Sequence, residues 1–196
     1  MNRRIKSVLG FMCTFLSISL ILVLILAQDA KADLNVDIYS GHSGTGGGAP
    51  YSGLVGSFTS PDVMFATNTG YAWHPFGLGV FGADITGFLN VPVNGNYTFT
   101  LNSDDGSQLF IDGGLVVDNG GAHGPQVASG SISLSAGLHP FEVQFFEDFG
   151  GPSGVDLYLP TDVNYGSPVP EPSTMLLLGS GLLGLAGYGR KKFLKK

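Results

Sequence analysis

Two adjacent carboxylates, Asp104 and Asp105, stand in the run Ser103-Asp104-Asp105-Gly106-Ser107. Ca²⁺ takes about six to eight oxygen ligands in a flexible geometry, and neighbouring carboxylates on a turn can supply several of them. A bound cation would also neutralise two like charges held close together. The run is equally ordinary turn chemistry, because Asp accepts backbone hydrogen bonds and Gly takes left-handed angles. On these residues alone the plain turn is the favoured interpretation.

Signatures of catalytic chemistry are missing from the sequence. There is no Gly-x-Ser-x-Gly nucleophile elbow and no His-Glu-x-x-His zinc motif. Residues 33–168 contain no Lys for a Schiff base and no Arg to hold an oxyanion. Paired carboxylates can cleave glycosides, but two neighbours on one turn are poorly placed to flank a bond. His42, His74 and His139 lie far apart without ligand spacing, so the sequence predicts neither an enzyme nor a zinc site.

The charges are distributed unevenly along the 196 residues. All nine Lys and Arg residues lie near the two ends, and thirteen of the fifteen acidic residues lie between residues 33 and 168. Nucleic acid is excluded as a partner, because phosphate binding requires clustered Lys or Arg. A cation is the natural complement of so acidic a region.

The first 32 residues have the character of an export signal. Basic residues precede an apolar run over 8–27, and Ala30-Lys31-Ala32 places small residues where signal peptidase cuts. We expect a signal peptide over 1–32 that is removed by signal peptidase, with a retained anchor as the alternative. The one cysteine, Cys13, falls inside this segment. The mature chain would therefore have neither a disulfide nor a thiolate metal site.

The C-terminus has three parts in order. A polar motif, Val169-Pro170-Glu171-Pro172-Ser173-Thr174, is followed by an apolar, Gly-rich run over 175–189 and a basic end over 190–196. The apolar run is shorter than the ~20 residues that span a bilayer comfortably. We nevertheless expect a short transmembrane helix over 175–189 and a cytoplasmic tail over 190–196. A short apolar tail between a polar motif and a basic cluster has the logic of a processed anchor.

These three parts resemble the PEP-CTERM sorting signal, with Pro170, Glu171 and Pro172 as the sorting motif. The resemblance implies processing by exosortase, a transpeptidase-like membrane enzyme of Gram-negative bacteria that also make exopolysaccharide. It implies a protein anchored in the inner membrane during sorting and then delivered to the cell surface or extracellular matrix. The alternative is an ordinary tail anchor, which would leave the same domain on the outer side of the inner membrane.

The region between the two ends is predicted to be all-β. Apolar and polar residues alternate in several short runs, which is typical of strands with one buried face. Strands are predicted over 34–39, 97–101, 108–111, 115–117, 132–134, 141–145 and 155–159. Asp112-Gly113-Gly114 predicts a hairpin, and seven glycines over 40–56 predict a long flexible loop or a linker-like lead-in. We therefore predict a β-barrel or sandwich over 33–162 and a linker over 163–174.

Several segments in this region carry a second resemblance. They include Ser103–Ser107, Leu109–Gly113, Val117–Gly120, Leu134–His139 and Val143–Glu147. In order and spacing they are similar to the PA14 domain, a β-barrel found in toxins, glycosidases, adhesins and yeast flocculins. The resemblance implies a PA14-type β-barrel or sandwich. The last predicted strand departs from the family, because it lacks the Trp that many relatives have near there.

The PA14 resemblance implies a ligand site. In sugar-binding members, two paired aspartates joined by a cis peptide coordinate Ca²⁺, and two sugar hydroxyls complete the metal's shell. Asp104 and Asp105 match these positions. Asp148 is the best candidate for an added carboxylate, because it lies in the loop that corresponds to a second ligand loop of the yeast proteins. Asn119 would edge the same site, and Phe149 would stack on a sugar face.

Plainer interpretations exist for the residues around this site. Glu147 is expected at a strand end, where it satisfies backbone groups, and Phe149 could instead cap the barrel. Asp118-Asn119-Gly120 is a good turn sequence. His123 is expected to be solvated. Trp73 is expected in the core rather than as a binding platform.

Together these features predict a non-enzymatic protein of the cell surface or extracellular matrix. Its expected activity is Ca²⁺-dependent binding of carbohydrate, such as exopolysaccharide. The alternative is a metal-free structural or adhesive matrix component.

Overall fold

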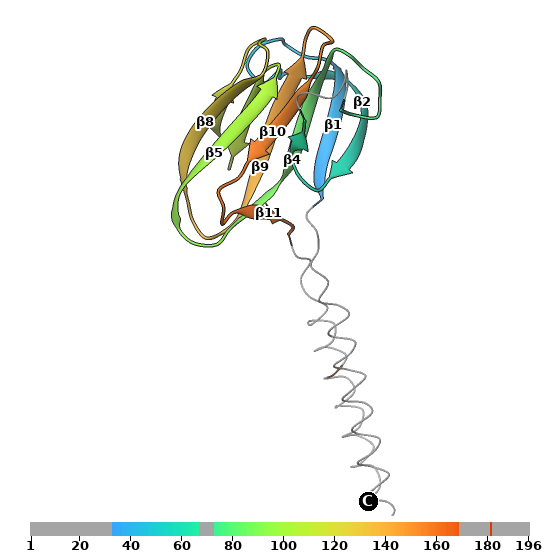
Figure 1. Ribbon diagram of the computed structural model, residues 1–196. Helices are drawn as coiled ribbons and strands as arrows, with labels where there is room; N and C mark the ends of the chain where they lie inside the picture. The colour runs from blue at the N-terminus through green and yellow to red at the C-terminus, as the bar shows by residue number, and fades with distance from the viewer. Residues whose placement is uncertain (1–32, 67–72, 169–180, 182–196) are drawn as a thin grey trace, which may run out of the picture. The chain divides into compact units, whose positions relative to one another are not determined.

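The computed structural model describes residues 33–66, 73–168 and 181, and the first two of these ranges contain eleven strands in two sheets (Figure 1). The all-β prediction is confirmed. The strands are β1 Leu34–Gly41, β2 Ser52–Ser60, β3 Met64–Phe65, β4 Phe81–Val91, β5 Gly95–Asp104, β6 Ser107–Ile111, β7 Gly114–Asn119, β8 Gln126–Leu134, β9 Gly137–Glu147, β10 Gly154–Tyr158 and β11 Asn164–Gly166.

The segments predicted as signal peptide, transmembrane helix and basic tail lie outside the described residues, apart from residue 181. Within the described part of the chain, no helix is both long enough and apolar enough to cross a bilayer.

The larger sheet has the order β2-β1-β4-β9-β6-β7, with β11 also paired to β4. Its central pair, β4 and β9, runs antiparallel from Phe81 opposite Glu147 to Val91 opposite Gly137. The smaller sheet has the order β3-β10-β5-β8. In it, β5 pairs with β10, and Asp104 lies opposite Gly154.

The core lies between the sheets and follows the predicted alternation. Phe141, Val143 and Phe145 of β9 are buried, and so are Phe99 and Leu101 of β5, whereas the residues between them are more exposed. Full burial of each such side chain contributes about 1.5–3 kcal/mol. The packed apolar faces therefore hold the two sheets together.

The two sheets form a sandwich rather than a closed barrel across residues 33–66 and 73–168. The barrel alternative of the prediction is wrong, and the sandwich alternative is right. Strands β7 and β8 approach each other at one corner, where a Cβ on Gly130 would overlap the Val116 carbonyl. No backbone ladder joins these two strands.

The domain continues beyond the boundary predicted at residue 162. Val163 is buried in the core, and β11 pairs with β4. The first part of the predicted linker therefore belongs to the larger sheet.

The Gly-rich segment predicted as a flexible loop or linker-like lead-in is partly strand, because β2 begins at Ser52 and pairs with β1. The preceding turn is closed by a 2.8 Å hydrogen bond from the Ser43 N–H to the Gly48 carbonyl. Gly48 has a φ of 95°, and a Cβ there would lie 2.7 Å from the Cβ of Phe146. Glycine is used here for close packing as well as for turning.

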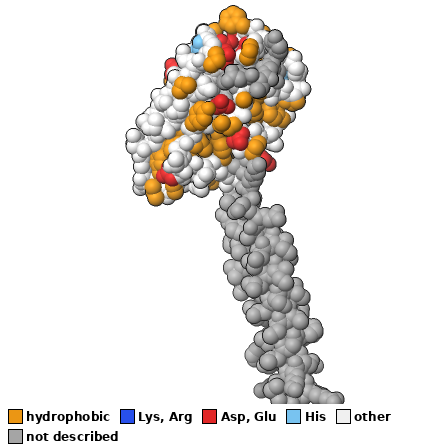
Figure 2. Space-filling view, viewed as in Figure 1, with side chains coloured by type: hydrophobic (Ala, Val, Ile, Leu, Met, Phe, Trp, Pro, Cys, Tyr) orange, Lys and Arg blue, Asp and Glu red, His pale blue; other side chains and the backbone are white. Residues whose placement is uncertain are grey.

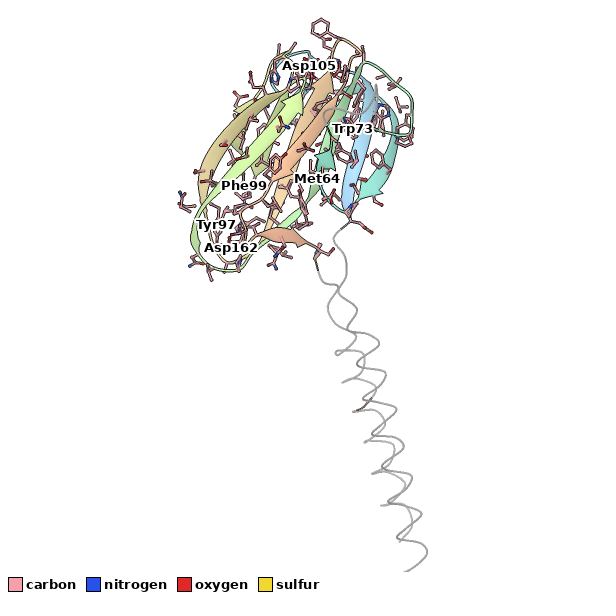
Figure 3. The ribbon with its side chains drawn as sticks, viewed as in Figure 1. Met64, Trp73, Tyr97, Phe99, Asp105 and Asp162 are labelled. Atoms are coloured by element: carbon pink, nitrogen blue, oxygen red, sulfur yellow. The ribbon has the colours of Figure 1, made fainter. Side chains whose placement is uncertain are left out.

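The sandwich has two distinct ends. Figure 3 places Asp105 at the end opposite Asp162. The described domain begins and ends near β11, on the Asp162 side (Figure 1). Figure 2 shows acidic and hydrophobic side chains but no Lys or Arg on the described part of the visible face.

Candidate metal and ligand site

Asp104 and Asp105 form the junction between β5 and β6. Asp104 is the last residue of β5, and β6 begins at Ser107. The peptide bond between the two aspartates is cis, as the family resemblance implies. A Cβ on Gly106 would lie 2.6 Å from the Gly121 carbonyl oxygen, so this turn requires glycine. The tight turn presents the Asp104 and Asp105 carboxyls to a shared pocket.

The Asp105 carboxylate ties three loops together. Its side chain is buried, its Oδ1 accepts the His123 N–H at 2.7 Å, and its Oδ2 accepts the Asp148 N–H at 3.0 Å. Each carboxylate oxygen can accept more than one bond. Asp105 therefore keeps capacity for a cation while it fixes the loops on either side.

Glu147, the last residue of β9, is the third carboxyl at this place. Its side chain is 2 % exposed, and its Oε1 accepts the N–H groups of Phe149 and Gly151, each at 3.2 Å. Its Oε2 is buried and has no hydrogen-bond partner among the described residues. A buried polar oxygen without a partner is costly, and this atom has the capacity to bind a ligand from outside the chain.

The electrostatics of the three carboxyls have one physical origin. Burial raises the pKa of Glu147 to about 7; the Gly151 N–H opposes the rise, and the charge of Asp105 adds to it. Burial, followed by repulsion from Asp105, also raises the pKa of Asp104. The chain supplies no Lys or Arg in residues 33–168 to offset these charges. A divalent cation would favour the charged forms instead.

The three carboxyls have a spacing that suits one metal ion. One oxygen each from Asp104, Asp105 and Glu147 lies within 4.8 Å of the others. Oxygens that bind one Ca²⁺ at about 2.3–2.6 Å can lie up to roughly 5 Å apart. The carboxyls line a cavity of about 280 Å³ together with His123 and Phe149. The Phe149 side chain is 78 % exposed, so its ring is open to solvent beside the carboxyls.

Asp148 lies next to this cluster but not in it. Its side chain is 41 % exposed, and its Oδ1 is 3.9 Å from the His42 Nε2. Asp148 contacts the site through its backbone, by the N–H that Asp105 accepts. Glu147, and not Asp148, joins the two paired aspartates in the cluster.

Asn119 lies behind the pocket instead of at its edge. Its side chain is 1 % exposed, and its Nδ2 donates to the Ser103 Oγ at 2.9 Å. Its Oδ1 accepts the Gln126 Nε2 at 3.0 Å. The Asn119 carbonyl oxygen is 3.0 Å from the His123 Nε2. Asn119 thus supports the loop that carries His123, and the His123 ring is held in place instead of being fully solvated.

The alternation along β9 contains the signal for Glu147. Phe141, Val143 and Phe145 face the core, and residue 147 continues the same face to the end of the strand. The backbone role expected for Glu147 is present as well. The core placement expected for Trp73 is confirmed, since its ring stacks on Phe65 with centroids 4.2 Å apart.

Comparison with known proteins identifies the family of the domain and of its C-terminal motif. The PA14 domain model matches residues 35–169, and the PEP-CTERM protein-sorting motif model matches residues 168–191. None of the curated proteins matches the chain. The sorting motif indicates export and placement at the cell surface.

Three solved structures illustrate the fold similarity. The PA14 domain of the MpAFP antifreeze protein has a TM-score of 0.56 at 15% identity, covering 71% of this chain and 93% of that chain. The PA14 sugar-binding domain from an RTX adhesin has a TM-score of 0.52 at 17% identity, covering 66% and 91%. An anti-sigma factor domain-containing protein has a TM-score of 0.56 at 20% identity over 68% of this chain, which spans 44% of that protein.

The similarity to these three structures shows a shared fold. The PA14 domain model matches most of the residues that the structure describes. The chain belongs to the PA14 domain family and carries a PEP-CTERM sorting motif at its C-terminal side.

Proposed function

We propose that this protein is processed by exosortase for the cell surface or matrix and binds carbohydrate through Ca²⁺ held by Asp104, Asp105 and Glu147. One observation carries the proposal. The Glu147 Oε2 is buried without a hydrogen-bond partner among the described residues, and Glu147 belongs to a cluster of three carboxyls. A cation is the partner that such a group lacks.

The three carboxyls would have different roles in binding the ion. Backbone N–H groups fix Asp105 and Glu147, so both would meet an ion in a preorganised position. Asp104, which is less buried, would approach from the solvent side. The all-oxygen donor set favours a hard cation, and the flexible requirements of Ca²⁺ suit it better than those of Mg²⁺. When bound, Ca²⁺ supplies coordination positions that sugar hydroxyls can occupy.

The neighbouring aromatic ring supports a carbohydrate ligand. Phe149 lines the same pocket, and 78 % of its side chain is exposed. A ring in that position can cover the apolar face of a sugar while the carboxyls and ion hold its hydroxyls. The PA14 domain of the RTX adhesin is described as sugar-binding, which supports the same ligand class here. Exopolysaccharide of the cell's own surface is the proposed ligand.

We assign supporting roles to Asp148 and Asn119. Asp148 would position Asp105 through its N–H, and its exposed carboxylate would add negative potential beside the ion. Asn119 would hold the His123 loop through its buried hydrogen bonds. Neither side chain needs to contact the ion for these roles.

A metal-free structural role is the second candidate, and the Asp105 contacts favour it. Asp105 joins the loops at His123 and Asp148 without any ion. On this account the sandwich is a spacer or adhesive unit in the matrix, and its acidic turn only closes the end of the fold.

A thermal melt of residues 33–168, first in EDTA and then with increasing Ca²⁺, separates the two functions. A ligand at a hundredfold its dissociation constant adds about 2.7 kcal/mol to the free energy of unfolding. We expect a Ca²⁺-specific rise that Mg²⁺ does not reproduce and that Asp104→Asn abolishes. A glycan screen with Ca²⁺ and with EDTA then identifies the sugar, and Phe149→Ala should weaken sugar binding without changing Ca²⁺ binding.

The control for this melt is Asp162→Asn, which removes an exposed carboxylate at the opposite end of the sandwich (Figure 3). It should keep the Ca²⁺ response. A melt that ignores Ca²⁺ in the unsubstituted chain would favour the metal-free role.

A further inference from the structure

A second concave surface lies away from the carboxyl cluster, on the outer face of the larger sheet. It is a groove of about 480 Å³ that crosses β1, β4, β9 and β6. Aromatic and aliphatic groups from Phe88, Phe110 and Pro140 line it, together with the polar side chains of Asn35, Thr86 and Glu142. The sheet register brings these residues together, since Thr86 lies opposite both Asn35 and Glu142, and Glu142 lies opposite Phe110.

The two ends of the described domain form part of the same groove. Asp33 lines it from the start of β1, and Gly166, Ser167 and Pro168 line it from the end of β11. The groove therefore lies where the chain enters and leaves the sandwich, at the end opposite Asp105 (Figures 1 and 3). A partner bound there would leave the carboxyl cluster free.

The groove includes the residue at which the match to the sorting motif begins. The PEP-CTERM model begins to match at Pro168, which is itself a groove residue. A fully extended chain covers at most about 3.6 Å per residue. The Cα of Glu171, three residues later, is thus within roughly 11 Å of the Cα of Pro168. A protein that binds Pro170-Glu171-Pro172 is therefore within reach of this groove.

The charges of the groove define the complementary partner. Asp33 and Glu142 are acidic, and residues 33–168 contain no Lys or Arg that could pair with them. The adjoining segment 169–174 carries its own acid, Glu171, so like charge disfavours it as the occupant. The groove fits a surface that presents an apolar side chain beside a Lys or Arg.

We propose that this groove is the docking surface for the membrane enzyme that processes the sorting motif. The proposal depends on the sorting part of the proposed function and not on calcium or sugar binding. Phe88 and Phe110 contact an apolar side chain of the enzyme, and Asp33 and Glu142 pair with its basic residues. Recognition of the substrate then involves the folded domain as well as the motif.

The test uses the full chain, expressed in cells that contain the sorting enzyme, and follows conversion of precursor to processed protein after a pulse label. We expect Phe88→Ser combined with Phe110→Ser to slow conversion about tenfold, the effect of losing roughly 1.4 kcal/mol of binding free energy. The single variant Phe110→Tyr, which keeps an aromatic ring in the groove, should keep most of the wild-type rate of conversion. The matched control is Val127→Ser, which removes an apolar side chain that is 64 % exposed on the other sheet.

Direct contact is tested by a photo-crosslinking residue, Asn35→p-benzoylphenylalanine, with the same replacement at Val127 as control. An adduct with the sorting enzyme, identified by antibody, is expected only from position 35. Wild-type conversion of the Phe88 and Phe110 variant would overturn the proposal. So would an adduct within the chain that forms without the enzyme, which would make segment 169–174 the occupant.

Two further measurements separate the possible failures. Glu171→Ala should block conversion; normal conversion of that variant would overturn both the sorting function and this docking surface. Resistance of the Phe88 and Phe110 variant to protease at the wild-type level shows that it is folded. A variant that converts normally but no longer retains surface glycan would make the groove a second glycan site and overturn enzyme docking.

Discussion

Glu147 combines a structural task with the proposed binding task through its two oxygens. Oε1 accepts two backbone N–H groups of the following loop, and Oε2 is buried without a hydrogen-bond partner among the described residues. Substitution can separate these tasks, because a glutamine keeps one oxygen for the loop and replaces the other with an amide nitrogen.

We expect Glu147→Gln to lower Ca²⁺ affinity at least about tenfold. The folded state should survive, because the glutamine oxygen can accept the same N–H groups. Isothermal titration with Ca²⁺ measures the affinity, and a melt in EDTA checks the fold. Asp162→Asn serves as the matched control. Unchanged Ca²⁺ affinity in Glu147→Gln would remove this residue from the ligand set.

The pH dependence of stability provides a second test of Glu147. Burial raises its pKa from 4.5 to about 7 in the folded chain. The folded state then holds the proton more tightly than the unfolded state. The stabilisation is fully present below about pH 4.5 and is lost as the pH rises through 7. In EDTA, the melting temperature should fall over this window, and less steeply in Glu147→Gln than in the unsubstituted chain.

The quantity to compare is the slope of melting temperature against pH in the unsubstituted chain and in Glu147→Gln. The slope of one chain alone is not enough, because Asp84 changes it in the same direction. Burial, followed by the charges of Glu142 and Asp37, raises the pKa of Asp84 to about 7. Equal slopes in the two chains would mean that Glu147 has no raised pKa.

At the scale of the strands, β7 and β8 pack closely at one corner of the sandwich. A Cβ on Gly130 would overlap the Val116 carbonyl of β7, so Gly130→Ala must separate the two strands locally. We expect a loss of about 1–3 kcal/mol in the free energy of unfolding, measured by urea denaturation. The control is Gly124→Ala, where no atom lies within 4 Å of the added Cβ and the change should stay within about 0.5 kcal/mol.

Close packing at glycines also explains why two of the strands that were not predicted are hard to recognise in the sequence. Strand β4 carries Gly82 and Gly87, where a Cβ would meet Tyr51 and Leu34 respectively. Glycine selected for such contacts looks like a turn signal in a sequence, and so β4 and β2 were not predicted. Strands with strict alternation, such as β5 and β9, were predicted at the right place but over shorter ranges.

The candidate site was predictable to the extent that it is local. Asp104 and Asp105 were identified from one short run and its family resemblance. Glu147 is 42 residues further along the chain than Asp105, and it reaches the same end of the sandwich through the pairing of β6 with β9, in which Ser107 lies opposite Phe145, and through the loop contact of Asp105 with Asp148. The alternation along β9 could have shown that the Glu147 side chain lies on the core side of the strand, but not how far it lies from the aspartates.

At the scale of the whole domain, the proposed binding site and the attachment of the chain lie at different ends of the sandwich. The carboxyl cluster lies opposite the entry and exit of the chain (Figures 1 and 3). A protein attached through its C-terminal side can therefore offer the proposed sugar site without obstruction by its own attachment. This arrangement also allows the groove beside Pro168 to bind a partner independently of the cluster.

The net charge of the domain leads to a prediction that involves no single residue. Residues 33–168 hold thirteen acids and no Lys or Arg. The acidic groups of such a domain repel one another more in the folded state than in an expanded one, and salt weakens the repulsion beyond a Debye length of about 8 Å at 0.15 M.

In EDTA, raising NaCl from about 20 to 500 mM should increase the melting temperature by a few degrees, since about 1 kcal/mol corresponds to roughly 2–8 °C for domains of this size range. Saturating Ca²⁺ should reduce the increment, because the two positive charges of the proposed ion would offset most of the negative charge of the three clustered carboxyls. A melting temperature that falls with NaCl would instead mean that local attractive contacts outweigh the repulsion among these acids.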